Sequence, residues 1–496
     1  MSQGRSCSNC GATIDPETYH CPLCRSPVRF KPVTPPHITP PHTAPPRATD
    51  RSDVSIPEKF GARLREGARA ELRRELEDSL HDAAQPSSSA GSSVGFSTTT
   101  VMPLAMPEQR EDFKSSQLSI ISYGQAYPYV VEYRPGKHSP AEIVEGRPIT
   151  AGIKSETIKE LENVYIEKVL KTMRKIGGIP PEQGGARMRL LENFHDTLVS
   201  FGKFLTDAIG GDVMNAIFNS PQGSRLQMRL DESALGIPWE LANLGEENSI
   251  LGLQYSIGKT VVSNKPTAEN RRGPRKETRV LMIAAAAEPT SRGLPVLKGF
   301  VPVLERLEKS LLKKGVAIRK IVGREATLAN VQRALSEDND IVIFNTHGGF
   351  GDEEQTTTLA AADGTLYSQD IQNLYLSSSY PPPLLWVSYA CETGTQRSWD
   401  KTTDSLPATL NRLNVPFVGP YWPAWGGSEE SSQPLVSSDI LLSEFFDKVF
   451  GSPPSTLGDA LMHGKRVLFD NEQRAFPDWA NFTLYGSPSL TIGLRN

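Results

Sequence analysis

Ile341-Val-Ile-Phe-Asn-Thr-His-Gly-Gly349 is the stretch of this 496-residue chain that decides its fold. The apolar run at its start predicts a buried strand, and a histidine and two glycines follow where that strand ends. Trp386-Val-Ser-Tyr-Ala-Cys-Glu-Thr-Gly394 repeats the pattern, with Cys391 just past the predicted strand. Because functional groups gather at the carboxyl ends of parallel strands, the two stretches predict one site.

Strands and helices alternate on both sides of these two stretches. The residue pattern predicts strands at 278–287, 316–322, 340–346, 384–390 and 415–419, and helices at 296–314, 327–335, 404–414, 437–450 and 455–469. Such alternation is typical of a mostly parallel sheet with helices on both faces. We therefore predict an α/β fold, an α/β/α sandwich, for residues 276–496.

A second globular part precedes this one, at residues 115–275. Its pattern predicts strands at 118–121, 127–133, 224–230 and 255–262, and helices at 156–176 and 187–209. The polar, basic segment 264–277 links the two parts. Within it, residues 271–276 form a candidate processing site, as does the Ser/Thr/Gly tract at 87–100.

The other four cysteines lie at the N-terminus, as Cys7, Cys10, Cys21 and Cys24. Two CxxC pairs supply four thiolates, which suit a tetrahedral zinc ion. A segment this short cannot fold by apolar burial, so metal binding would supply its folding free energy. We predict a zinc ribbon at residues 5–30 with one structural Zn²⁺. Four ligands close the coordination sphere, which argues against a catalytic metal.

Residues 31–114 have the composition of a linker. The stretch at 31–50 is rich in proline and threonine, and the tract at 87–100 is typical of disorder. Between them, residues 57–84 predict a highly charged helix with a thin apolar stripe. That helix is either a solvated helix or a docking helix for a partner.

Net charge and the N-terminal residues restrict the class of protein. A net charge of −4 and a pI near 6.1 leave no global footprint for nucleic acid, although the ribbon is locally basic. The ribbon's partner, protein or nucleic acid, stays open. The first residues lack the apolar core of a signal peptide, and no apolar run is long enough to span a membrane. These features predict a cytoplasmic protein.

His347 and Cys391 are the candidate catalytic pair, 44 residues apart. A thiol nucleophile needs a base to hold the thiolate, and a histidine about 50 residues upstream of an Ala-Cys strand end is the caspase pattern. The N–H groups of Gly348 and Cys391 are placed to form an oxyanion hole. Taken alone, a buried cysteine is more often inert and a histidine more often structural; order, spacing and strand-end placement together favour catalysis.

Residues 115–495 resemble a CHAT domain, a branch of the caspase-like cysteine peptidases. The resemblance is carried by Leu235-Gly-Ile-Pro-Trp-Glu-Leu241, Ile250-Leu-Gly-Leu-Gln-Tyr-Ser-Ile257 and Asn345-Thr-His-Gly-Gly349, and by Ala390-Cys-Glu-Thr-Gly394 and Phe482-Thr-Leu-Tyr-Gly-Ser-Pro-Ser-Leu490. It implies a caspase-like fold, with His347 as general base, Cys391 as nucleophile and Gly348 in the oxyanion hole.

The resemblance also implies a biological setting. Relatives act in bacterial antiviral defence, where some activate gasdermin-like pore-formers. By that likeness, we expect an endopeptidase that cleaves a specific protein partner and is activated by another protein. The rival hypothesis is a non-catalytic scaffold whose ribbon binds protein or nucleic acid.

Five residues are candidates for substrate binding. Glu392, beside the nucleophile, is placed to attract a basic substrate segment, and Tyr389 stands where caspases have a glutamine that shapes the specificity pocket. Tyr421, Trp422 and Trp425 follow the next strand, where caspase-like folds place a substrate-groove loop. Ordinary packing is the competing explanation for these aromatic residues.

Overall fold

A computed structural model describes the chain in separate ranges. They are residues 5–6, 13–14, 116–122, 129–136, 149–177, 184–245, 249–262, 277–285, 288, 296, 300–351, 356–391, 393–394, 405–422, 437–470 and 478–492. The chain divides into two compact units, Met1–Arg63 and Leu64–Asn496. In the first, strands β1 (Arg5–Ser6) and β2 (Thr13–Ile14) pair antiparallel. The four N-terminal cysteines and the predicted linker helix lie outside the described residues.

An 11-stranded sheet forms the second unit, in the order β5-β4-β3-β6-β7-β16-β15-β14-β10-β8-β9. Its strands are β3 (Ser116–Ser122), β4 (Tyr129–Arg134), β5 (Ile149–Ile153), β6 (Arg225–Leu230), β7 (Ser256–Val261), β8 (Arg279–Ala284), β9 (Ala317–Val322), β10 (Ile341–Phe344), β14 (Leu385–Ser388), β15 (Phe417–Pro420) and β16 (Phe482–Tyr485). The described pairs are parallel except β3–β4, β4–β5 and β15–β16. The predicted α/β fold with a mostly parallel sheet is confirmed.

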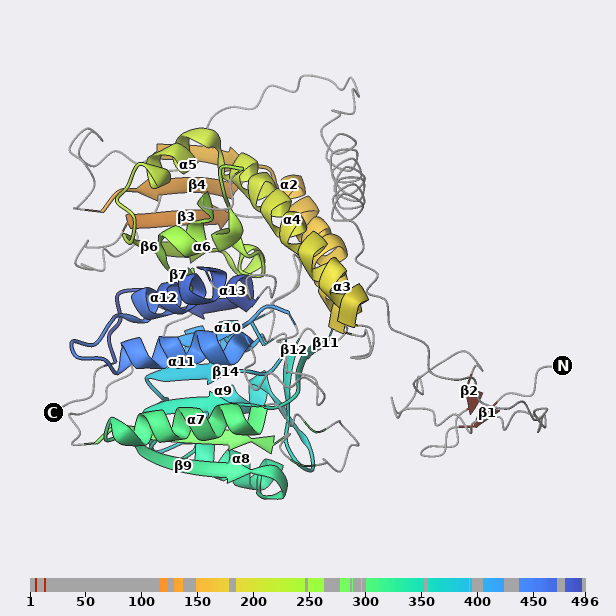
Figure 1. Ribbon diagram of the computed structural model, residues 1–496, viewed down its shortest axis with the longest axis vertical. Coiled ribbons are helices and arrows are strands. Elements are labelled where there is room, and N and C mark those ends of the chain that lie inside the picture. The colour runs from red at the N-terminus through yellow and green to blue at the C-terminus, as the bar shows by residue number, and fades with distance from the viewer. Residues whose placement is uncertain are drawn as a thin grey trace, which may run out of the picture. The chain divides into compact units, whose positions relative to one another are not determined.

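Helices cover both faces of this sheet (Figure 1). Their bounds are α2 (Ser155–Val164), α3 (Lys171–Gly177), α4 (Gly184–Ile209), α5 (Gly211–Phe218), α6 (Leu251–Gln254), α7 (Phe300–Lys313), α8 (Leu328–Leu335), α9 (Ser368–Ser377), α10 (Leu406–Arg412), α11 (Ser437–Val449), α12 (Leu457–Asp470) and α13 (Asp478–Asn481). Helix α11 packs between α7 and α12, while α9 packs between α8 and α10. The helix predicted at 156–176 contains a π-helical turn, Tyr165–Leu170, between α2 and α3.

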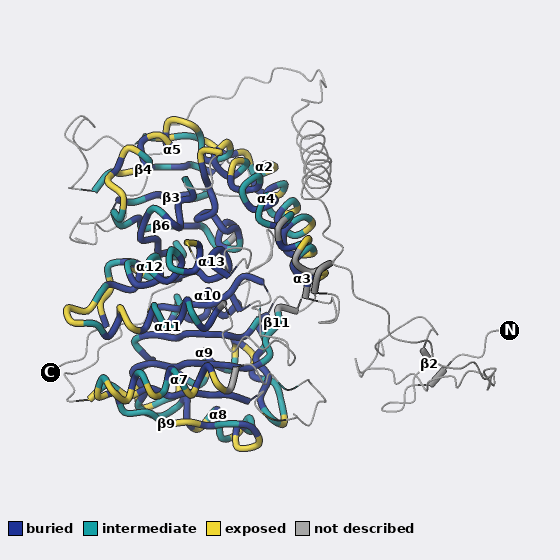
Figure 2. The backbone as a smooth tube through the Cα atoms, in the orientation of Figure 1, coloured by how far each residue is buried: buried dark blue, intermediate teal, exposed yellow. Residues whose placement is uncertain are grey.

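The central strands are buried on both faces, which explains their unbroken apolar runs. Every residue of β10, β14, β15 and β16 is buried, and Figure 2 shows this middle of the sheet in dark blue. In the layer on one side of β10 and β14, the rings of Phe344 and Trp386 stack with centroids 5.9 Å apart. Such burial is expected of parallel strands that helices cover on both faces.

The two globular parts of the chain share this one sheet. Strand β7 of the first part pairs in parallel with β16, the last strand, and Lys259 lies opposite Tyr485. A Cβ added to Gly258 would collide with the carbonyl oxygen of Gly486 and lie 2.8 Å from the backbone nitrogen of Pro488, so the two segments meet backbone to backbone. The division predicted at residue 275 therefore separates two parts of one sheet.

A small antiparallel sheet follows His347 directly. It consists of β11 (Gly348–Gly351), β12 (Thr356–Ala360) and β13 (Thr365–Tyr367), in that order. The sequence did not predict it, because glycine and threonine dominate its short strands and no apolar alternation marks them. Its first strand begins at the glycine next to the candidate general base, so it frames the site.

Candidate active site

Strands β10 and β14 carry the two candidate catalytic residues at matching positions. They are parallel neighbours, and Phe344 at the end of β10 lies opposite Ser388 at the end of β14. His347 and Cys391 each follow three residues after these partners. The N–H of Tyr389 donates to the carbonyl of Phe344 at 2.8 Å, which extends the pairing past the strands. The register therefore delivers both residues to the same edge of the sheet, as the sequence predicted for its two strand ends.

Gly348 shows how closely the two loops approach. A Cβ added to this glycine would lie 2.6 Å from the carbonyl oxygen of Cys391 and 2.8 Å from Cβ of Ala390. Real Cβ atoms do not come so close to backbone, so only glycine fits between the histidine and the loop that carries Cys391. The segment that carries His347 thus packs directly on the segment that carries Cys391.

The backbone of His347 is held by the small sheet. Its carbonyl accepts a hydrogen bond from the N–H of Ala360 at 2.9 Å, and Thr346 Oγ1 donates to the carbonyl of Ala360 at 2.6 Å. Thr346 is buried, whereas His347 is half-buried. Strand β12 therefore fixes the loop while leaving the imidazole partly accessible.

Hydrogen bonds hold the loop that carries Cys391 just after that residue. Thr393, fully buried, donates from Oγ1 to the carbonyl of Ala390 at 2.9 Å. The N–H of Gly394 donates to the carbonyl of Pro420 at 2.7 Å, and the hydroxyl of Tyr485 donates to the carbonyl of Gly394 at 2.6 Å. The thiol of Cys391 is free of any disulfide and half-buried. A partly accessible cysteine on a loop that packs against the segment carrying a histidine fits what thiol catalysis requires.

The aromatic residues predicted to bind substrate lie in the core instead. Tyr389 is 2% exposed, and Tyr421 and Trp422 are fully buried. Burial raises the pKa of Tyr389 well above its usual value, as does the charge of Asp439 on α11, while Arg306 on α7 opposes both. Burial of Tyr421 and Trp422 favours the competing explanation, ordinary packing, over a groove wall, and Tyr389 likewise packs in the core rather than lining an open specificity pocket. Glu392 and Trp425 lie outside the described residues.

A buried ionic cluster lies between the two parts of the sheet, and sequence reasoning assigned it no role. Glu240 belongs to the quoted Leu235–Leu241 motif, and its carboxylate lies 2.5 Å from Nζ of Lys259 on β7. Both side chains are almost fully buried. Burial alone would raise the pKa of Glu240, but the charges of Lys259 and Lys465 outweigh it and the net shift is downward. The feature of the sequence that could have revealed this cluster is a charged residue, Glu240, inside an otherwise apolar motif.

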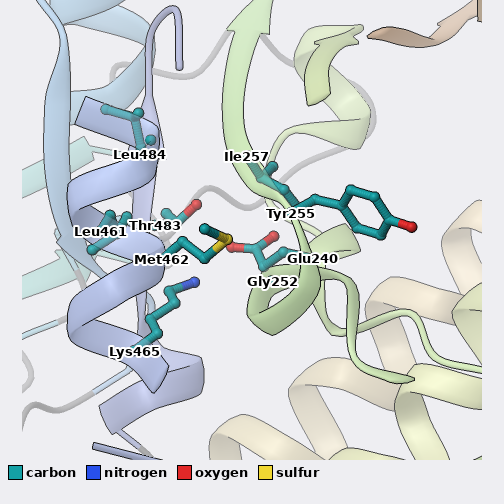
Figure 3. A pocket seen from close by; sticks show the side chains of 10 residues that line it. Glu240, Gly252, Tyr255, Ile257, Leu461, Met462, Lys465, Thr483 and Leu484 are labelled. Atoms are coloured by element: carbon teal, nitrogen blue, oxygen red, sulfur yellow. The ribbon is translucent and has the colours of Figure 1, made fainter. Parts of the chain in front are cut away.

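A small pocket opens beside this cluster. Burial lowers the pKa of Lys465 to about 8, although Glu240 pulls it upward. Figure 3 shows Glu240 and Lys465 pointing into the same pocket from different elements. It is lined by Glu240, Gly252, Tyr255, Ile257, Gly458, Leu461, Met462, Lys465, Thr483 and Leu484.

The described ranges contain neither a metal-binding cluster nor a membrane-spanning helix. Among these residues no three His, Cys, Asp or Glu side chains come together in a way that could hold a metal ion. Nor does any helix in the described ranges have the length and apolar character needed to cross a membrane.

Residues 301–493 match the family model of peptidase family C25. That region contains both His347 and Cys391 and the strands that present them. The match supports a cysteine peptidase domain in this region, and a peptidase acts on protein. No curated protein is similar enough to the chain to count as a match.

Several solved structures are distantly similar. The Arg-specific cysteine proteinase gingipain R is 13% identical, with 60% of this chain and 68% of that chain covered and a TM-score of 0.38. The complex of the Porphyromonas gingivalis RgpB pro- and mature domains is 14% identical. The match covers 68% of this chain and 78% of that chain, with a TM-score of 0.36. The Saccharomyces cerevisiae separase–securin complex gives 9% identity, covers 76% of this chain and 30% of that chain, and has a TM-score of 0.43.

Proposed function

We propose that the chain is a CHAT-type cysteine endopeptidase in which Cys391 is the nucleophile and His347 the general base. His347 takes the thiol proton, and the thiolate attacks the scissile carbonyl carbon. The N–H groups of Gly348 and Cys391 stabilise the resulting oxyanion. The C–N bond then breaks as His347 returns the proton to the leaving amine, and water hydrolyses the thioester.

The observation that carries this proposal is the matched register of β10 and β14. It sets His347 and Cys391 at equal distances past neighbouring strand ends, and Gly348 packs on the nucleophile loop. A histidine and a cysteine with unrelated structural roles would not need this arrangement. The family match over residues 301–493 supports the same chemistry.

We infer that the substrate is a specific protein in the bacterial cytoplasm and that another protein activates the enzyme. The motif resemblance to CHAT peptidases of antiviral defence supports this setting, with a gasdermin-like pore-former as one substrate class. Extended peptides bind such sheet-end sites through their main chain.

Cleavage of native proteins tests the proposal. A bacterial lysate supplies both substrates and activators, and mass spectrometry of new N-termini records the cuts. Wild type should generate N-termini that Cys391→Ala does not, and His347→Gln should lower their yield by about 100-fold or more. Identical sets of N-termini in wild type and Cys391→Ala would rule out an endopeptidase and favour the non-catalytic scaffold.

For residues 5–30 we propose a structural zinc ribbon with Cys7, Cys10, Cys21 and Cys24 as ligands. Four thiolates in two CxxC pairs are the donor set that zinc prefers in closed sites. Metal analysis of the purified chain should give about one zinc ion per molecule, and Cys7→Ser with Cys10→Ser should remove it. Zinc content unchanged in that double variant would refute the site. A ribbon that binds nucleic acid would show affinity that falls steeply with salt.

A further inference from the structure

Gly394, three residues after the nucleophile, is held from two sides. Its N–H donates to the carbonyl of Pro420 at the end of β15, at 2.7 Å. Its own carbonyl accepts from the hydroxyl of Tyr485 at the end of β16, at 2.6 Å. Both strands lie on the side of β14 that leads toward β7 and the first part of the chain. The loop that carries Cys391 is therefore fastened toward that part.

Lys259 on β7 links Tyr485 to the first part of the chain. It lies opposite Tyr485 on the neighbouring strand, and its Nζ is 6.0 Å from the Tyr485 ring centroid and 4.8 Å from that of Tyr421. The side chain of Lys259 is fully buried. The desolvated cation binds the hydroxyl of Tyr421 directly and attracts the ring of Tyr485 more weakly, since such attraction is strongest where water is excluded.

Each proton of the Lys259 ammonium has an acceptor. They are a carboxylate oxygen of Glu240 at 2.5 Å, the carbonyl of Ile237 at 3.1 Å and the hydroxyl of Tyr421. Tyr421 in turn donates its hydroxyl proton to Glu240 at 3.0 Å. A buried network in which every donor is satisfied has one low-energy arrangement, so it is rigid.

We propose that Tyr485 is a positioning residue for the Cys391 loop and that the buried Glu240–Lys259 pair holds Tyr485 and Tyr421 in place. This positioning role rests on the proposed function, because it acts on the proposed nucleophile, Cys391. Tyr485 is buried, and its hydroxyl holds the carbonyl of Gly394 and so the backbone that presents Cys391. A partner that shifts residues 115–262 relative to β16 would change the geometry of the nucleophile through these side chains.

The competing explanation is that the cluster only stabilises the core. Both explanations predict some loss of stability when a hydroxyl or a charge is removed. Only positioning predicts a change confined to the loop that carries Cys391. The readouts are therefore deuterium uptake by the peptide spanning residues 388–395 and the rate at which iodoacetamide alkylates Cys391.

Tyr485→Phe is the first variant, and it keeps the ring that stacks on Phe417. Its matched control is Tyr133→Phe, which removes a buried hydroxyl bonded to Ser220 in the first part of the chain. We expect Tyr485→Phe to raise uptake in 388–395 and to change the Cys391 alkylation rate by about fivefold to tenfold, the effect of one hydrogen bond. Tyr133→Phe should leave both unchanged.

A second variant tests the ionic link. Glu240→Gln combined with Lys259→Met removes both charges of the pair, and measurement at about pH 9, above the pKa of about 8 of the neighbouring Lys465, leaves no lone buried charge at the cluster. It should loosen the loop in the same way, although neither residue touches it. Unchanged uptake and alkylation in Tyr485→Phe, or equal changes in Tyr133→Phe, would overturn the positioning role. An altered loop in Tyr485→Phe but not in the double variant would overturn the link to Glu240.

The two proposals fail separately in these measurements. If lysate cleavage by wild type does not depend on Cys391, the proposed function fails while loop positioning is still measured by deuterium uptake. If wild type cleaves and Tyr485→Phe matches it in kcat, KM and uptake, the function stands and the positioning role is wrong.

Discussion

At the scale of single residues, Gly348 has the tightest requirement in the site. The space where its Cβ would stand is occupied by the Cys391 carbonyl oxygen and by Ala390. Its neighbour Gly349 is different, because the nearest atom to an added Cβ is Thr358 Oγ1 at 3.7 Å, an ordinary contact. The two adjacent glycines therefore differ in what a methyl group would meet.

This difference gives the first prediction. Gly348→Ala should push the histidine segment away from the nucleophile loop, lower the rate of cleavage by about 10-fold or more and cost about 1–3 kcal/mol of stability. Gly349→Ala should change both by much less. Peptide or lysate cleavage and urea unfolding measure the two effects, and equal losses in the two variants would contradict the packing described for Gly348.

At the scale of elements, helices α7 and α11 are joined by an ion pair between Arg306 and Asp439. The Asp439 side chain is 1% exposed, and its second oxygen accepts from Ser443 at 3.2 Å. Arg319 and Glu337 form a comparable pair, but both of these side chains are more than 40% exposed. Burial of the carboxylate should therefore decide which pair matters for stability.

We expect Arg306→Met to destabilise the fold by about 2 kcal/mol, because a buried carboxylate loses its charged partner. Arg319→Met should cost less than about 1 kcal/mol, since exposed pairs are screened by water. Urea unfolding of the two variants provides the comparison. A larger loss for Arg319→Met would contradict the idea that burial of the Asp439 carboxylate makes the α7–α11 pair the more important one.

Also at the scale of elements, the sequence predicted the strands that carry the site better than those around it. Strands β10 and β14 were predicted to within a few residues, because strands buried on both faces appear as unbroken apolar runs. The sheet of β11 to β13 escaped prediction, since its stability comes from Thr346, Thr358 and main-chain pairing. Tyr421 and Trp422 were predicted to line a groove but are buried. Their burial depends on which helices cover the end of β15, and no local sequence pattern shows that.

At the scale of the whole molecule, one continuous sheet joins a C-terminal peptidase region to residues 115–262. The predicted catalytic pair arises within the C-terminal region. The buried Glu240–Lys259 pair belongs to residues 115–262 and reaches across the junction through its hydrogen bonds with Tyr421. Lys465 on α12 adds a second ammonium near the same carboxylate. The charges of Glu240, Lys259 and Lys465 should therefore affect the free energy of unfolding of the whole sheet.

Stability should rise with pH between about 8 and 10 through Lys465. Its pKa in the folded protein is about 8, below the ordinary value of 10.5, so in this window the unfolded chain binds more protons than the folded one. Below about pH 8 both states carry the proton and the contribution is constant. Urea unfolding from pH 7 to 10 should show a flatter rise in Lys465→Met than in wild type or in Lys203→Met, a change at an exposed lysine. Equal slopes in all three would contradict the burial of a charged Lys465.

The pH dependence of Cys391 alkylation tests the assignment of the catalytic pair most directly. Iodoacetamide reacts with the thiolate, and mass spectrometry of the peptide containing Cys391 follows this cysteine alone. In wild type the rate should already be high near pH 7, because His347 favours the thiolate, and His347→Ala should move the rise toward the ordinary thiol pKa of about 8.5. Superimposable profiles in wild type and His347→Ala, both rising near pH 8.5, would contradict a Cys391–His347 pair.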